Sequence, residues 1–200
     1  MVQLRKDQCM SSENPSSNQP LSIKLVVICY TTLFLLSLLW GYFQGRTIPW
    51  KMDPSSPHHL SDLLIGIGFG LVVVFLSFIS TERFEWGRGL ERVFAKALTP
   101  LAWWQILTIA LASSIGEEFF FRGAMQPVFG LILTSLIFGF IHFPIQRPLI
   151  PWTLMALVMG FILGWLFKWR GNLISPITCH FVINFSNLII LNRRTKKPDS

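Results

Sequence analysis

The stretch "LAWWQILTIALASSIGEEFFFRGAMQPVFGLILTSLIFGFI", residues 101–141, is almost wholly apolar except for a charged group near its centre. An ionisable side chain at the middle of a bilayer costs about 2.5–3.5 kcal/mol on insertion scales, so two carboxylates and a guanidinium need a reason to be there. The apolar flanks are long enough to predict membrane-spanning helices. This stretch therefore indicates both the class of the fold and the place of its chemistry.

The composition of the whole chain supports a membrane protein. Of its 200 residues, 52% are hydrophobic and 14% are charged, whereas soluble proteins average about 25% charged residues. A soluble domain of this size could not bury so much apolar surface. The chain is therefore predicted to be an all-α, polytopic transmembrane helix bundle with about six spans, at residues 21–43, 61–80, 101–126, 131–146, 149–167 and 174–191.

Four regions follow from the order of polar and apolar segments. Residues 1–20 are polar and are predicted to form a disordered N-terminal tail. Residues 21–100 are predicted to hold two variable spans and a charged interfacial segment at 81–100, with a shallow apolar face. Residues 101–191 are predicted to form the bundle that carries the chemistry, and residues 192–200 form a basic C-terminal tail. The first span lacks a small-residue cleavage site, so it is expected to be retained rather than removed as a signal peptide.

The basic residues and the cysteines exclude several classes of function. The net charge is +7, but the basic residues lie mostly between and beyond the spans. They are better explained by orientation in the membrane than by nucleic-acid binding, and they place both termini in the cytoplasm. The three cysteines form no CxxC pair, which argues against a disulfide framework and against a cysteine-rich zinc site.

The charged residues of the central stretch have a helical spacing. Glu118 and Arg122 are four residues apart, so they share one helix face and are predicted to form an ion pair. Glu117 lies about 100° around the helix from Glu118, so both carboxylates cannot meet the arginine equally well. One acid is then neutralised while the other stays free to act.

Two later segments carry the same spacing. Phe138 and His142 share one helix face, and His180 and Asn184 share another. Pro127 and Gly130 predict a turn between the first two helices. Glu117 lies 13 residues before Gly130 (130 − 117) and His142 lies 12 residues after it (142 − 130), so both reach about 20 Å from the turn in an antiparallel hairpin.

Each polar residue also has a simpler interpretation. The Glu118–Arg122 pair is expected to be structural, a lone intramembrane histidine often only bonds a neighbouring helix, and Asn184 could hold helices together with about 0.6 kcal/mol. The histidines at 58 and 59 are expected to be solvated loop residues, and the aromatic run at 119–121 is expected to face lipid. Glu117, His142 and His180 nevertheless lie on three separate predicted helices, and ionisable residues on three membrane helices favour a common site.

A carboxylate and two imidazoles can polarise a water molecule, either directly or through a divalent metal. Asn184 could donate a hydrogen bond to the oxyanion that forms when water attacks a carbonyl. This chemistry needs no serine or cysteine nucleophile. Cys179 lies about 100° from His180 on the helix, which argues against a Cys–His dyad.

The motifs EExxxR (Glu117, Glu118 and Arg122), FxxxH (Phe138 and His142) and HxxxN (His180 and Asn184) occur in this order on successive predicted helices. Together they resemble the CAAX-protease and bacteriocin-processing family of intramembrane proteases, over about residues 101–190. The resemblance implies that Glu117 activates the attacking water with His142 and His180, and that Asn184 supports the oxyanion. It also implies that Glu118 and Arg122 are an ordering pair and that Phe138 is a cavity wall.

The resemblance leaves the metal open. Members are usually described as metallopeptidases, and Glu117, His142 and His180 are the candidate ligands of a Zn²⁺ ion. The same three residues also suit a metal-free glutamate base.

The function predicted on these grounds is intramembrane hydrolysis of a peptide bond. The partners are a peptide or protein substrate at the membrane, such as the C-terminus of a lipid-modified protein, and the lipid bilayer. Nucleic acid is not expected as a partner, and the sequence leaves the oligomeric state open. Two alternatives remain: a proton-coupled transporter that uses Glu117 and the histidines as a relay, and a non-catalytic membrane scaffold of the same fold.

Overall fold

The computed structural model describes residues 22–45, 58–143 and 150–196, and this part of the chain is helical with no strand. The predicted N-terminal tail, residues 1–20, lies outside the described residues. The elements are α1 (Ile23–Phe43), α2 (His59–Arg83), α3 (Glu85–Leu98), α4 (Trp103–Glu118), the π-helix η1 (Phe119–Met125), α5 (Gln126–Ile141), α6 (Ile150–Arg170) and α7 (Ile174–Lys196). The predicted all-α class is confirmed.

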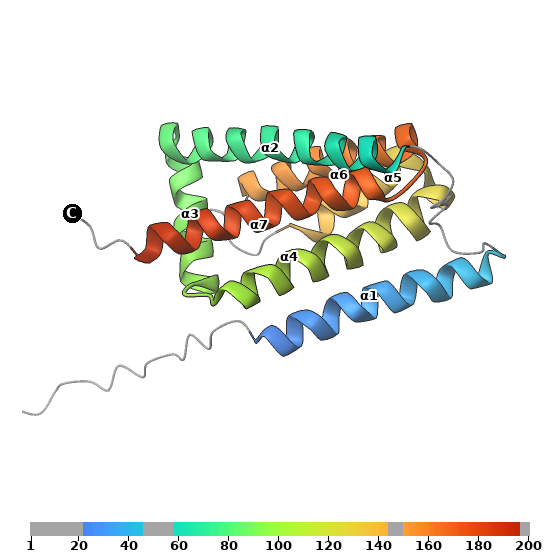
Figure 1. Ribbon diagram of the computed structural model, residues 1–200, viewed down its shortest axis with the longest axis horizontal. Coiled ribbons are helices and arrows are strands. Elements are labelled where there is room, and N and C mark those ends of the chain that lie inside the picture. The colour runs from blue at the N-terminus through green and yellow to red at the C-terminus, as the bar shows by residue number, and fades with distance from the viewer. Residues whose placement is uncertain (1–21, 46–57, 144–149, 197–200) are drawn as a thin grey trace, which may run out of the picture.

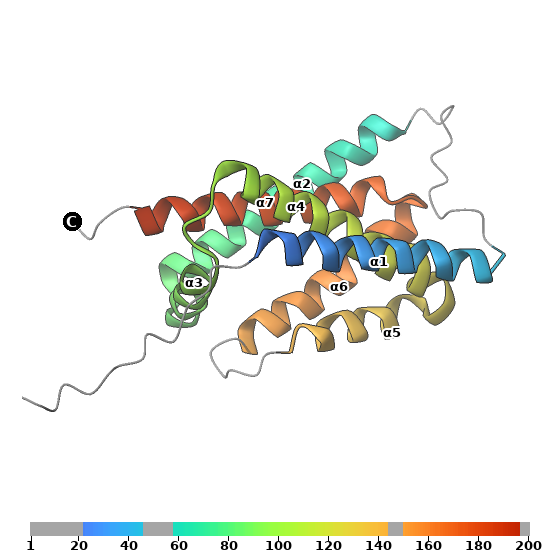
Figure 2. The same cartoon turned by 90° about the horizontal axis from the view of Figure 1, so that it is seen from below.

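The long helices lie side by side along one axis of the molecule, and α3 crosses them at one end (Figures 1 and 2). Helices that follow one another along the chain run in alternating directions. The start of α1 and the end of α7 lie at the same end of the bundle (Figure 1). This agrees with the prediction that both termini face one side of the membrane, and their cytoplasmic location stays a prediction.

Five helices in the described part of the chain are long and apolar enough to cross a membrane. One of them, Trp103–Ile141, contains two of the six predicted segments, because two helices follow each other directly across a kink at Gly130. The backbone of Gly130 has φ 77° and ψ 171°, so the predicted turn is confirmed. The arm after Gly130 has 11 residues, about 17 Å, and is too short to span a bilayer core of about 30 Å alone.

The interfacial segment predicted at 81–100 contains the amphipathic helix α3. Its direction, across the ends of the long helices, is the one expected of a helix at the membrane surface (Figure 1). Leu90, Phe94 and Leu98 line a cavity inside the bundle. The apolar face of α3 is therefore turned toward the inside of the bundle.

Glycines set the distance between the helices that carry the site. A Cβ at Gly66 of α2 would lie 2.6 Å from the carbonyl oxygen of Ser175 on α7. A Cβ at Gly160 of α6 would lie 3.0 Å from the carbonyl oxygen of Ser135 on α5. Small residues allow such close approach of helices in a membrane. They hold α7, which bears His180, against α2, and α5, which His142 directly follows, against α6.

Two sequence predictions need correction at the element ends. Residues 192–196, which include Arg193, Arg194 and Lys196, continue α7 rather than begin a separate tail, and residues 197–200 lie outside the described part of the chain. His59 begins α2 and is half-buried, so it is not a solvated loop residue, whereas His58 before it is exposed. A helix start with Asp62 in its first turn fits the preference of helix N-termini for negative charge.

Candidate active site

The helix that carries the charged motif changes its winding at the motif. The α-helix α4 ends at Glu118, and the π-helix η1 begins at Phe119. Single π-helical turns occur frequently at functional sites. Phe119 and Phe121 are 5% and 2% exposed, so the prediction that this aromatic run faces lipid is wrong for these two residues. They pack inside the bundle and support the charged residues from within.

Glu118 and Arg122 form the predicted ion pair. Nη1 of Arg122 lies 3.0 Å from Oε1 of Glu118, and both side chains are buried. Nη2 of Arg122 donates to the carbonyl oxygen of Gly160 at 3.2 Å, and the guanidinium carbon lies 4.4 Å from the ring centre of Phe138. A buried charge is tolerated when it is paired and hydrogen-bonded. The pair therefore joins α4 and η1 to α6 and to the predicted wall residue Phe138.

His180 of α7 contacts Glu118 rather than Glu117. Its Nδ1 lies 2.8 Å from Oε1 of Glu118, the oxygen that also accepts from Arg122. An ionised carboxylate only accepts hydrogen bonds, so the ring N–H donates. The two carboxylates lie about 100° apart on α4, and it is Glu118 that meets the histidine of α7. The resemblance implies that both histidines act with Glu117, and in this structure His180 is hydrogen-bonded to Glu118 of the ordering pair.

Glu117 faces the other histidine. Its Oε2 lies 4.0 Å from Nε2 of His142, so the prediction that these residues reach the same depth is confirmed. Nδ1 of His142 lies 2.6 Å from the carbonyl oxygen of Phe138, which accepts the Nδ1 proton and leaves Nε2 to face the acid. Oε2 of Glu117 is buried and has no hydrogen-bond partner among the described residues. A polar separation of this size is one that a bridging water can fill.

Asn184 is held by a residue that sequence reasoning missed. Its Nδ2 donates to Oγ of Ser113 at 2.8 Å, and Ser113 lies four residues before Glu117 on α4. That spacing puts Ser113 and Glu117 on one helix face, which is the signal that could have identified Ser113. One amide proton of Asn184 remains for another acceptor.

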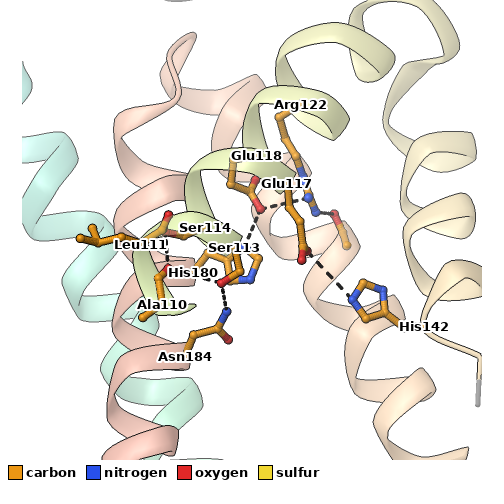
Figure 3. Close-up of polar contacts among 11 residues, drawn as sticks. Ala110, Leu111, Ser113, Ser114, Glu117, Glu118, Arg122, His142, His180 and Asn184 are labelled. Atoms are coloured by element: carbon orange, nitrogen blue, oxygen red, sulfur yellow. Dashed lines mark hydrogen bonds and ion pairs between the residues drawn. The ribbon is translucent and has the colours of Figure 1, made fainter. Parts of the chain in front are cut away.

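One cavity brings the candidates together. It has a volume of about 490 Å³, and its lining includes Glu117, His142, His180, Asn184 and Phe138. Figure 3 shows the two glutamates on α4 between His180 and Asn184 on one side and His142 on the other. Most of the remaining lining is apolar, including residues of α3 and α6. The cavity can thus hold an apolar chain with a polar group at Glu117.

The residues predicted to bind Zn²⁺ do not assemble as a ligand set. Among the described residues, no three His, Cys, Asp or Glu side chains gather closely enough to hold a metal ion. His180 turns toward Glu118, while Glu117 faces His142. As they are placed, these side chains therefore do not form a three-ligand metal site.

Comparisons with known proteins agree with the motifs. Residues 99–186 match the family model described as type II CAAX prenyl endopeptidase Rce1-like. The chain is 31% identical over 126 residues to the uncharacterized protein YpbD of Bacillus subtilis (strain 168), a match that covers 60% of this chain and 63% of YpbD. No solved structure matches.

The matched segment runs from the residue before the cis-linked Pro100 to the second turn after His180, and it contains every motif residue. Five helices that suit a membrane and a match to a membrane protease family make the chain an integral membrane protein. Residues 99–186, which carry all three motifs, are therefore similar to the Rce1-like family of type II CAAX prenyl endopeptidases.

Proposed function

We propose that this chain is an intramembrane endopeptidase that hydrolyses a peptide bond by means of a water molecule activated at Glu117. The observation that carries the proposal is the Glu117–His142 pair, in which a buried carboxylate oxygen without a hydrogen bond lies 4.0 Å from an imidazole nitrogen in a cavity. A carboxylate in that state is suited to accept a proton from water. The match to a protease family supports the same class of reaction.

The residues divide the reaction between them. A water held between Oε2 of Glu117 and Nε2 of His142 gives a proton to Glu117 as its oxygen bonds to the scissile carbonyl carbon. Asn184, anchored on Ser113, donates its remaining amide proton to the oxyanion. Glu117 then passes the proton to the leaving nitrogen as the C–N bond breaks. No step needs a metal.

The ordering pair has a different part in this proposal. Arg122 fixes Glu118, and Glu118 fixes His180 at the cavity wall. His180 then contacts the bound peptide from the side opposite His142. Because Glu118 accepts two hydrogen bonds from cationic or ring donors, it is poorly placed to accept a proton from water as well.

The proposed substrate is the C-terminal region of a lipid-modified membrane protein, of the CAAX type. The cavity lining is mainly apolar around a polar centre, which suits a peptide linked to a hydrocarbon group. The matched family model carries the same substrate class in its description.

The test is cleavage by purified protein of a panel of C-terminal peptides, with and without a prenyl group and with and without chelator. Glu117→Gln is expected to lower kcat by about 10³-fold, since general base catalysis contributes about 10²–10⁴-fold. Glu85→Gln is the matched control, because the side chain of Glu85 is 96% exposed. The control is expected to cleave at the wild-type rate.

The outcomes separate the alternatives. Cleavage that persists in chelator supports the metal-free mechanism, and its loss would require a metal that the described side chains do not assemble. Full activity of Glu117→Gln would contradict the role of Glu117. A wild-type protein that cleaves no peptide of the panel would contradict the CAAX-type proposal.

A further inference from the structure

Only a narrow face of helix α1 packs against the rest of the bundle. Val26, Ser37 and Gly41 of α1 are buried, and Tyr30 on the same side is half-buried. Other residues of α1, such as Leu25 and Ile28, are more than half exposed, as expected for a surface in lipid. Spacings of four and seven residues put 26, 30, 37 and 41 on one face. Tyr30 is thus the one ionisable side chain on the bundle-facing side of α1 within its described residues.

Tyr30 meets Glu117 across this interface. The Tyr30 hydroxyl approaches the Glu117 carboxyl closely enough to form a hydrogen bond with it on a small shift, and both side chains line the same two cavities. A phenol donates and a carboxylate accepts in such a bond. Because Oε2 of Glu117 has no hydrogen-bond partner among the described residues, the phenol is expected to donate to the other oxygen, Oε1. The free oxygen is then the one that faces His142.

Close packing fixes Tyr30 at this position. A Cβ at Gly116, the residue before Glu117, would lie 2.8 Å from the carbonyl oxygen of Tyr30 and 3.1 Å from its Cβ. One turn further along, the rings of Phe34 and Phe119 contact edge to face, with centroids 4.9 Å apart. The backbones of α1 and α4 therefore touch beside Glu117, and a larger residue at 116 would separate them.

Tyr30 also stands where two cavities meet. A second cavity, of about 530 Å³, is lined by apolar residues of α1, η1 and α5, among them Leu33, Trp40 and Met125. Glu117, His142, Tyr30 and Trp152 line both cavities. The phenol thus lies at the boundary that contains the reactive carboxylate.

We propose that Tyr30 is a positioning residue of the site, whose hydroxyl donates to Glu117 and holds the carboxylate with Oε2 directed at His142. The proposal rests on the proposed function for its kinetic consequence, since it gives Glu117 an orienting partner. It adds to the site a helix outside residues 99–186, the segment that matches the family model.

The direct test is Tyr30→Phe, which removes the hydroxyl and keeps the ring. Tyr42→Phe is the matched control, because Tyr42 is the other tyrosine of the chain, lies on the same helix and is 78% exposed. Tyr30→Phe is expected to lower kcat about tenfold with KM within twofold of wild type, since a hydrogen bond to a charged group is lost while the ring still fills its place. The control is expected to match wild type.

A combined variant distinguishes positioning from packing. If Tyr30 acts through Glu117, Tyr30→Phe/Glu117→Gln is expected to cleave no more slowly than Glu117→Gln alone, since residues that act as a unit are not additive. A further tenfold loss in the combined variant would overturn the proposal. Equal kcat for wild type and Tyr30→Phe would overturn it as well.

A second readout needs no catalysis. Dicyclohexylcarbodiimide reacts with carboxyl groups in apolar surroundings, and mass spectrometry of the labelled protein measures its rate at Glu117. Tyr30→Phe is expected to raise that rate several-fold, with no change in Tyr42→Phe. An unchanged rate in Tyr30→Phe would refute the contact even if no substrate is cleaved, whereas a raised rate with no cleavage by wild type would refute only the proposed function.

Discussion

Two groups of buried acids lie in this bundle, and they are satisfied in different ways. Asp62, near the start of α2, is fully buried, and both of its carboxylate oxygens accept hydrogen bonds, from Arg170 and from Asn172. Its backbone carbonyl accepts from Ser175. In the central group, Oε2 of Glu117 and Oε2 of Glu118 have no partner among the described residues.

The difference separates a structural acid from a reactive one. Asp62 ties α2 to the connection between α6 and α7, and none of its acceptors remains for a substrate. Leaving a buried polar atom without a partner costs about 1–3 kcal/mol, so a fold retains such an atom at a cost in stability. Glu117 lines the cavity, where a substrate or water can supply the missing hydrogen bond. The central group is therefore expected to take part in the reaction, whereas Asp62 is expected to contribute to the stability of the fold.

The largest effect on stability is expected at Glu118. Glu118→Gln leaves the buried Arg122 without its counter-charge, and breaking a buried pair in this way costs about 3–5 kcal/mol. The free energy of unfolding would be measured by denaturant titration in mixed micelles. A loss below about 1 kcal/mol would mean that water or lipid headgroups already solvate Arg122.

A double variant checks the cause of that loss. Glu118→Gln/Arg122→Met removes both charges and keeps much of the volume, so it is expected to recover more than half of the lost stability. If the double variant is less stable than either single variant, packing rather than charge explains the effect. The single variant Arg122→Met completes the double-mutant cycle.

A smaller effect is expected at Asp62. Asp62→Asn turns an amide group toward the donor of Asn172 and removes the charge that Arg170 meets, which is expected to cost about 2 kcal/mol. The loss is smaller than at Glu118 because the side chain of Arg170 is 20% exposed and can reach solvent. The rate of cleavage per folded molecule is expected to stay at the wild-type value. A fall in kcat without a fall in stability would place Asp62 in the reaction.

Helical spacing predicted much of the central group. Residues four apart share a face, and this identified the Glu118–Arg122 pair and the neighbouring rings of Phe138 and His142, whose centroids lie 4.6 Å apart. The count of residues to Gly130 predicted that Glu117 and His142 meet. These predictions held because they depend on contacts within one hairpin, where the helix geometry sets the distances.

Contacts between helices distant in the chain were not predictable. Which carboxylate His180 meets depends on how α7 lies against α4, and its distance from Glu118 is set by packing rather than by spacing. Asp62 was missed because it lies at the edge of an apolar segment, where a solvated flanking residue is the ordinary interpretation. Tyr30 gave no signal, since a tyrosine in an apolar span is common and its partner lies 87 residues later (117 − 30).

The smallest effect is expected at a third acidic group, on the surface at the end of the bundle. Arg194 of α7 lies 2.5 Å from Glu82 and 3.0 Å from Glu91, and its guanidinium carbon lies 5.2 Å from the ring centre of Phe78. The side chains of Arg194 and Glu82 are 30% and 51% exposed, so solvent screens the pair and Arg194→Gln is expected to cost less than about 1 kcal/mol. About 1 M salt is expected to abolish the difference from wild type, because the screening length then falls to about 3 Å. A salt-independent loss as large as that of Glu118→Gln would show that the number of charge contacts, and not their burial, decides which acids hold this bundle together.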